Sequence, residues 1–125
     1  MYKELQDKVI QDYKVIIVTD SKCWSRTHAH CNDGTRRVCK WKQVESYPAT
    51  LELFHEIGHL ETDKSGMKRA EQESEATIWG INKMKEFGLP IKRKYANQYK
   101  DYVRMTFDRG VRRGLKKNIK SKLYM

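Results

Sequence analysis

The chain has 125 residues, 38% of them hydrophobic and 34% charged, which is enough for one modest core and predicts a single domain over residues 1–125. Residues 1–90 contain 14 Lys/Arg and 14 Asp/Glu, whereas residues 91–125 contain 12 Lys/Arg and 2 Asp, so the net charge of +10 belongs to a basic C-terminal arm on a neutral body. The longest apolar run, Val15 to Val18, is too short to cross a bilayer, and the N-terminus lacks a secretory signal, so we exclude a membrane-spanning protein and expect a cytoplasmic one.

The first third of the chain predicts a helix followed by strands. Residues 2–12 alternate charged and apolar side chains, as a short amphipathic helix does. Residues 13–18 are mostly apolar and β-branched, which indicates a buried strand. Residues 27–31 and 35–41 flank Asn32-Asp33-Gly34, whose residue types tolerate the positive φ of hairpin turns, so we expect an antiparallel hairpin there.

The remainder predicts helices. Ser46-Tyr47-Pro48 is typical of a helix start, and this helix should run to about Thr62. A second helix fits residues 67–87 and ends at Gly88, and a third begins near Lys92. The order of helix, strands and helices predicts an α+β domain.

One short motif carries the chemistry. Residues 55–59 read HEIGH, an HExxH sequence inside a predicted helix that is otherwise apolar. A spacing of four residues is about one helical turn, so His55 and His59 project from the same face and can bind one ion. Glu56, beside the first ligand, can accept a proton from a zinc-bound water as general base. We therefore predict one Zn²⁺ per chain and hydrolysis of a carbonyl compound.

A catalytic zinc needs a third protein ligand and one open position. The extended motif with a third histidine is excluded, because Thr62 and Ser65 stand where its glycine and histidine would be. The next helix offers glutamates. We predict Glu75 as the ligand, because it shares a helix face with Trp79, and Glu71 as a partner to a metal-bound histidine or as the alternative ligand, with Glu73 pointing elsewhere. Alternatively, these glutamates form a solvated face that pairs with Lys68 and Arg69.

HEIGH followed by Glu-x-Glu-Ala-x-x-Trp-Gly resembles the ImmA/IrrE family of gluzincin-type metallopeptidases over roughly residues 13–90. The resemblance implies a zincin-like fold, with a small antiparallel sheet or hairpin packed on the HExxH helix, a second ligand-bearing helix and a C-terminal basic helix. It also implies His55, His59 and Glu75 as zinc ligands and Glu56 as the catalytic residue. Known members are intracellular peptidases, often encoded by phages or mobile elements, that act on a DNA-binding repressor.

A second group of metal-binding residue types lies in and before the predicted hairpin: Cys23, His28, His30, Cys31 and Cys39. Their spacing contains no Cys-x-x-Cys pair, so we favour a hairpin with buried cysteines and exposed histidines over a structural zinc site. The odd number of cysteines suits a reducing compartment better than a disulfide framework.

The basic arm combines an aromatic stripe with clustered charge. The stripe follows helical spacing and predicts core packing, although one tyrosine could stabilise an oxyanion; it contains Tyr95, Tyr99, Tyr102, Val103, Phe107, Val111 and Leu115. The cations of the arm are either a solvated helix face or a surface for nucleic acid or an acidic protein, with Arg112, Arg113, Lys116 and Lys117 as candidates.

The preferred function is a zinc peptidase acting on an intracellular protein, such as a DNA-binding repressor or regulator. The alternative is a nucleic-acid-associated or protein-binding regulator that keeps the zincin fold with structural zinc and no turnover.

Overall fold

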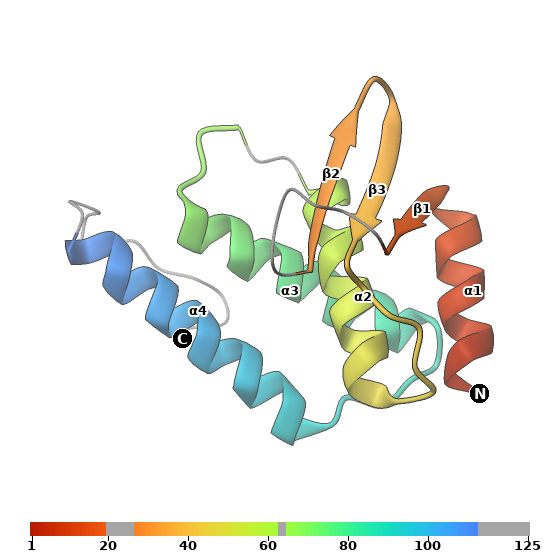
Figure 1. The fold of residues 1–125 in the computed structure, drawn as a ribbon. Helices are drawn as coiled ribbons and strands as arrows, with labels where there is room; N and C mark the ends of the chain where they lie inside the picture. The colour runs from red at the N-terminus through yellow and green to blue at the C-terminus, as the bar shows by residue number, and fades with distance from the viewer. Residues whose placement is uncertain (20–26, 63–64, 113–125) are drawn as a thin grey trace.

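Helices and strands follow each other in α+β order in the computed structural model, which describes residues 1–19, 27–62 and 65–112 (Figure 1). The predicted α+β class is therefore confirmed, and every predicted element lies within a few residues of an observed one. The elements are α1 (Tyr2–Asp12), β1 (Val15–Val18), β2 (His28–Asn32), β3 (Thr35–Cys39), α2 (Tyr47–Glu61), α3 (Arg69–Glu86) and α4 (Arg93–Arg112).

The sheet is mixed rather than antiparallel, which corrects the prediction. Its order is β1-β3-β2, with β2 and β3 forming the expected antiparallel hairpin around Asp33 and Gly34, whose φ angles are 54° and 75°. β1 pairs in parallel with β3, with Val15 opposite Arg36 and Val18 opposite Cys39. The consequence is that β2 forms one edge of the sheet and lies over α2 in Figure 1.

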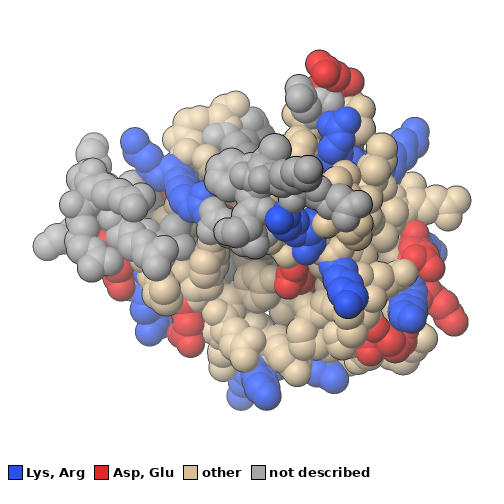
Figure 2. Space-filling model, viewed as in Figure 1, with Lys and Arg blue, Asp and Glu red and all other residues tan. Residues whose placement is uncertain are grey.

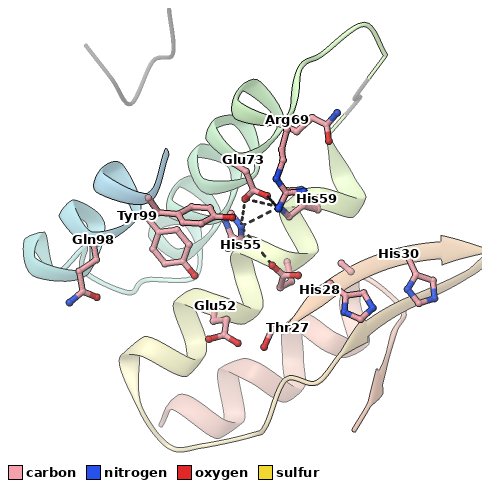
Figure 3. A pocket seen from close by; sticks show the side chains of 14 residues that line it. Thr27, His28, His30, Glu52, His55, His59, Arg69, Glu73, Gln98 and Tyr99 are labelled. Atoms are coloured by element: carbon pink, nitrogen blue, oxygen red, sulfur yellow. Dashed lines mark hydrogen bonds and ion pairs between the residues drawn. The ribbon is translucent and has the colours of Figure 1, made fainter. Parts of the chain in front are cut away.

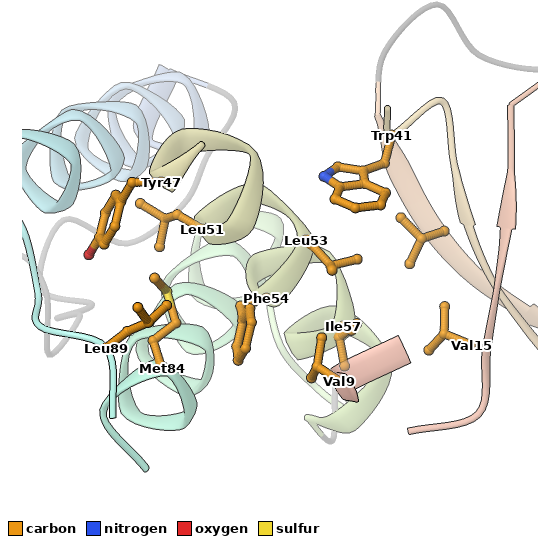
Figure 4. Close-up of a cluster of buried hydrophobic side chains, with 11 residues drawn as sticks. Val9, Val15, Trp41, Tyr47, Leu51, Leu53, Phe54, Ile57, Met84 and Leu89 are labelled. Atoms are coloured by element: carbon orange, nitrogen blue, oxygen red, sulfur yellow. The ribbon is translucent and has the colours of Figure 1, made fainter. Parts of the chain in front are cut away.

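Helix α2 is the centre of the core. It begins at Ser46, whose Oγ accepts a hydrogen bond of 3.2 Å from the backbone N–H of Ala49, and Pro48 follows in the first turn as the sequence predicted. α1, the sheet and α3 all pack around it, so nearly all its sides are apolar (Figure 4). The buried cluster contains Val9, Val15, Val38, Trp41, Tyr47, Leu51, Leu53, Phe54, Ile57, Met84 and Leu89.

α2 and α3 approach each other unusually closely, because glycine stands at both sides of the contact. A Cβ added at Gly58 would lie 2.4 Å from the carbonyl oxygen of Ala76. A Cβ added at Gly80 would lie 3.1 Å from the backbone nitrogen of His55. The backbones therefore meet next to the HExxH motif, which brings side chains of α3 within reach of its histidines.

Helix α4 shows that the predicted basic arm is not separate from the body. Its first turns pack on the core through Tyr95 and Tyr99, and Tyr102 is half-buried, as predicted for the first part of the aromatic stripe. The remaining members of the stripe lie outside the described side chains: Val103, Phe107, Val111 and Leu115. Backbone of α4 is described to Arg112, but its side chain and the predicted contact residues Arg113, Lys116 and Lys117 lie outside the described side chains. The face seen in Figure 2 carries Lys and Arg side chains interspersed with acidic ones. None of the described helices is long and apolar enough to cross a membrane.

Candidate metal centre

The two histidines of the motif converge with one carboxylate. His55 Nε2 and His59 Nε2 lie 3.2 Å apart, and Glu73 Oε2 lies 3.0 Å from the first and 3.1 Å from the second. Figure 3 shows the three side chains pointing toward one another from α2 and α3. His55 and Glu73 are only 5% and 6% exposed, so three metal-binding side chains meet in a largely buried position.

The carboxylate is Glu73, so the prediction that Glu75 faces the histidines is wrong. The inward face of α3 is a stripe of mostly small residues, Ala70, Glu73, Thr77 and Gly80, which fits the close approach to α2. Trp79 lies on a neighbouring face and packs edge-on against Tyr13, with 5.2 Å between ring centroids. The prediction took the face of α3 that carries Trp79 as the inward one. The close approach of α2 and α3 instead favours the face with small side chains.

Glu71 also does not take its predicted place beside a histidine. Its Oε1 accepts a hydrogen bond of 3.3 Å from the backbone N–H of Lys68, which satisfies a donor at the N-terminus of α3. The alternative ion pairing is seen in one weak contact, since Arg69 Nη2 lies 3.8 Å from Glu73 Oε1.

The partner of His55 is Thr77, which the sequence analysis did not identify. The Thr77 hydroxyl donates to the carbonyl oxygen of Glu73 at 2.9 Å, so its oxygen is left to accept from His55 Nδ1–H, also at 2.9 Å. With the proton on Nδ1, the neutral ring presents the lone pair of Nε2 to the cluster, which is the tautomer a metal requires. In the sequence, the indication of this role is that Thr77 follows Glu73 by four residues, which places its hydroxyl on the same helix face as the carboxylate.

Electrostatics hold the cluster in the protonation state of a metal site. Burial lowers the pKa of His55 below its ordinary value of 6.5, so its ring is neutral. Burial alone would raise the pKa of Glu73, but its close contacts with the imidazoles of His55 and His59 outweigh this effect and hold the pKa well below the ordinary 4.5. A neutral imidazole and an ionised carboxylate are the forms that bind metal.

Glu56 lies beside the cluster without joining it. Its Oε1 is 3.7 Å from His55 Nε2, and the residue is 6% exposed. The predicted base is therefore adjacent to the three converging atoms but farther away than they are from one another.

The cluster opens onto a cavity of about 780 Å³. Its walls come from four segments: the start of β2, the polar side of α2, the first turns of α3, and the middle of α4. The residues are Thr27, His28, Ala29, His30, Glu52, His55, Glu56, His59, Arg69, Gln72, Glu73, Gln98, Tyr99 and Tyr102. A cavity of this size admits a short peptide segment.

Among the tyrosines of the stripe, Tyr99 has a ring that contacts a histidine of the cluster. Its ring lies against His55, with 4.9 Å between centroids and 44° between planes (Figure 3). Burial, followed by the negative charges of Glu52 and Glu56, raises the pKa of the phenol, so it keeps its proton. The sequence placed Tyr99 on a packing stripe but did not separate it from Tyr95 or Tyr102.

The donor set fits zinc. Three atoms that bind one tetrahedral zinc at about 2.0–2.1 Å lie about 3.3 Å apart. The observed separations of 3.0, 3.1 and 3.2 Å between the nitrogen and oxygen atoms are close to that value. Two imidazoles and one carboxylate that face a cavity also match a catalytic site with an open position better than a closed structural site.

A second group of donors lies on the hairpin: His28, His30 and Cys39. The expected burial is only partly observed, because Cys39 is buried and His30 exposed, but Cys31 is exposed and His28 half-buried. Cys23 lies outside the described residues.

Comparison of the chain with protein-family models, curated proteins and solved structures finds no match. The resemblance to the ImmA/IrrE family stays a prediction from the motif residues.

Proposed function

We propose that this protein is a zinc-dependent metallopeptidase that hydrolyses a peptide bond in a protein substrate. The observation that carries the proposal is the convergence of His55, His59 and Glu73 to within 3.0–3.2 Å at the wall of a cavity. A bound zinc ion would supply Lewis acidity, which polarises a carbonyl and lowers the pKa of water to about 7.

Glu56 moves the protons in this mechanism. It is the only carboxylate among the described residues that lies next to the three donors without being one of them. As general base it takes a proton from the attacking water, and as general acid it passes that proton to the leaving amine.

Tyr99 and Thr77 support the reacting groups. The phenol of Tyr99, protonated and adjacent to His55, is suited to donate a hydrogen bond to the oxygen on which negative charge develops. Thr77 keeps the ring of His55 oriented through Nδ1.

An extended substrate segment fits along β2. This strand pairs with β3 on one side, has no strand partner on the other side among the described residues, and lines the cavity from Thr27 to His30. Backbone pairing along such an edge positions a peptide without strong dependence on its sequence. The substrate should therefore be an unstructured or exposed segment of a protein.

The test uses the untagged full-length protein and a mixed peptide library in H₂¹⁸O, read by mass spectrometry. We expect new carboxyl termini that contain ¹⁸O, lost on chelation and restored by zinc. Glu56→Gln should keep zinc and lower turnover by about 10²–10⁴-fold, because the amide cannot accept the proton. Glu75→Gln, a change of the same kind on α3 outside the cavity lining, is the control and should remain active.

Two outcomes would overturn the proposal. Cleavage by Glu56→Gln at the parental rate would remove Glu56 from the mechanism. Stoichiometric zinc at His55 and His59 with no cleavage of any library member, or of candidate repressors added as intact proteins, would favour a regulator with structural zinc and no turnover.

A further inference from the structure

The hairpin beside the cavity places two imidazoles and one thiol together. β2 and β3 pair so that His28 is directly opposite Cys39 and His30 is opposite Arg37. Residues at alternate positions share a face of the sheet, so His28, His30 and Cys39 all lie on one face. We propose that these three side chains form a second metal site, which takes Zn²⁺.

The distances suit a shared ion. Cys39 Sγ and His30 Nδ1 lie 3.8 Å apart, and each of the three residues offers a donor atom within 4.8 Å of the others. Thiolate and imidazole ligands on one tetrahedral zinc, at about 2.3 and 2.0–2.1 Å, are separated by about 3.5 Å. The rings of His28 and His30 are stacked, with 5.6 Å between centroids and 17° between planes, so the two imidazoles lie side by side next to the sulfur.

A hydrogen bond between the thiol and one histidine explains only part of this arrangement. The single S–H proton serves one imidazole, whereas an ion is shared by all three donors. Cys39 is 1% exposed and His30 is exposed, so the group runs from the interior of the sheet to solvent. An ion can therefore enter from the exposed end and reach a thiol that is otherwise buried.

The chemistry of the donors selects the metal. Imidazole and thiolate favour Zn²⁺ and exclude Mg²⁺ and Ca²⁺, which require oxygen ligands. Binding would release the proton of the Cys39 thiol, since the thiolate is the ligand. Because His28 and His30 also line the cavity, such an ion would stabilise the strand edge along which we place the substrate.

The site shares no residue with His55, His59 and Glu73, and the inference does not depend on the proposed function. The two sites also differ in a spectroscopic property. A Co²⁺ ion held by a thiolate gives a near-ultraviolet charge-transfer band, whereas a Co²⁺ ion held by imidazoles and a carboxylate does not.

The experiment titrates Co²⁺ into the untagged, metal-free full-length protein under reducing conditions and follows this band. We expect the band to saturate at two equivalents, because the site at His55, His59 and Glu73 also takes one ion, and to disappear when Zn²⁺ displaces cobalt. His55→Ala/His59→Ala should keep the band and saturate it at one equivalent, and Cys31→Ser should keep it as well. Cys39→Ser should abolish it.

Cys39 is buried, so the fold of Cys39→Ser is checked by circular dichroism, and an exposed ligand provides a second variant. His30→Gln removes a proposed ligand. Losing a hydrogen-bond partner of a metal ligand costs about 10–100-fold in affinity, so losing the ligand itself should weaken cobalt binding by more than that. A saturated wild-type protein without the band, a band that survives in Cys39→Ser, or unchanged affinity in His30→Gln would each overturn the second site. A wild-type protein that hydrolyses peptides but lacks the band would keep the proposed function and remove only this site.

Discussion

Two groups of candidate metal ligands lie beside one cavity, and they are supported in different ways. The helical cluster, His55, His59 and Glu73, projects from two buried helices, and its donor atoms lie 3.0–3.2 Å apart. The hairpin cluster, His28, His30 and Cys39, projects from an edge strand and its neighbour, and its donors spread over as much as 4.8 Å.

The smaller spread of donor atoms in the helical cluster has two structural causes. In the helical cluster, the close contact at Gly58 and Gly80 sets the distance between ligands, and Thr77 sets the tautomer of His55. In the hairpin cluster, only strand register brings the donors together, and one of them is exposed. We therefore expect the helical cluster to bind metal more tightly, and variants that affect one cluster should leave the other unchanged.

The largest effect is expected from Glu73→Ala. It removes one of the three protein donors. Zinc affinity at the helical cluster should therefore fall by more than the about 10–100-fold that removal of a ligand's hydrogen-bond partner costs, and hydrolysis should be lost. The matched control is Glu75→Ala on the same helix, which should retain zinc. Competition titration with a chelator decides the order, and weaker binding in Glu75→Ala than in Glu73→Ala would contradict the assignment.

Thr77→Val should have the next largest effect. The substitution keeps the size of the side chain but leaves the buried His55 Nδ1–H without an acceptor, so zinc affinity or activity should fall by about 10–100-fold. Thr77→Ser retains the hydroxyl and should restore most of the loss. The cobalt band of the hairpin cluster should not change in either variant. Equal behaviour of the Val and Ser variants would show that Thr77 acts only through packing.

Gly58→Ala tests the close helix contact that supports the helical cluster and has no counterpart in the hairpin cluster. The added Cβ would lie 2.4 Å from the carbonyl oxygen of Ala76, and because the neighbour is backbone, α3 must move. We expect the free energy of unfolding to fall by about 1–3 kcal/mol, with weaker zinc binding. Gly80→Ala, where the nearest backbone atoms are 3.1 Å away, should cost less. Urea unfolding measures both, and a smaller loss for Gly58→Ala than for Gly80→Ala would contradict the packing argument.

The smallest expected effect is the dependence of the free energy of unfolding on pH. Burial lowers the pKa of His55 below 6.5. Burial opposes a lowered pKa of Glu73, but the close contacts of its carboxylate with the imidazoles of His55 and His59 outweigh this effect. Below these ordinary values, 6.5 and then 4.5, the unfolded chain binds protons that the folded metal-free protein does not. The free energy of unfolding should therefore decrease as pH falls, in two stages.

Urea unfolding of the metal-free protein from pH 8 to pH 4 measures this decrease. Glu73→Gln should show a smaller decrease near the lower value, because the amide does not titrate. An unfolding free energy of the metal-free protein that stays constant from neutral pH to pH 4 would contradict the proposed protonation states.

The sequence predicted the parts of this molecule that depend on local pattern. His55 and His59 share a helix face whatever the rest of the fold does, and Asn32-Asp33-Gly34 specifies a turn by its own conformational preferences. Element order and the start of α2 at Ser46 followed from similar short-range signals.

The parts that depend on packing between distant segments could not be predicted in this way. Whether Glu73 or Glu75 faces α2 depends on how closely two helices approach, which Gly58 and Gly80 decide together. The parallel pairing of β1 with β3 depends on a crossover that no residue pattern specifies. Tyr99 reaches His55 only because α4 folds back onto the body.

The central claim is that His55, His59 and Glu73 hold one zinc ion with an open position toward the cavity. A crystal of the zinc-loaded protein, measured at the zinc absorption edge, tests it directly. We predict an anomalous peak about 2.0–2.2 Å from Nε2 of both histidines and from a carboxylate oxygen of Glu73, with no fourth protein ligand. Absence of a peak at these atoms in zinc-saturated crystals, or a peak enclosed by four protein side chains, would contradict the account.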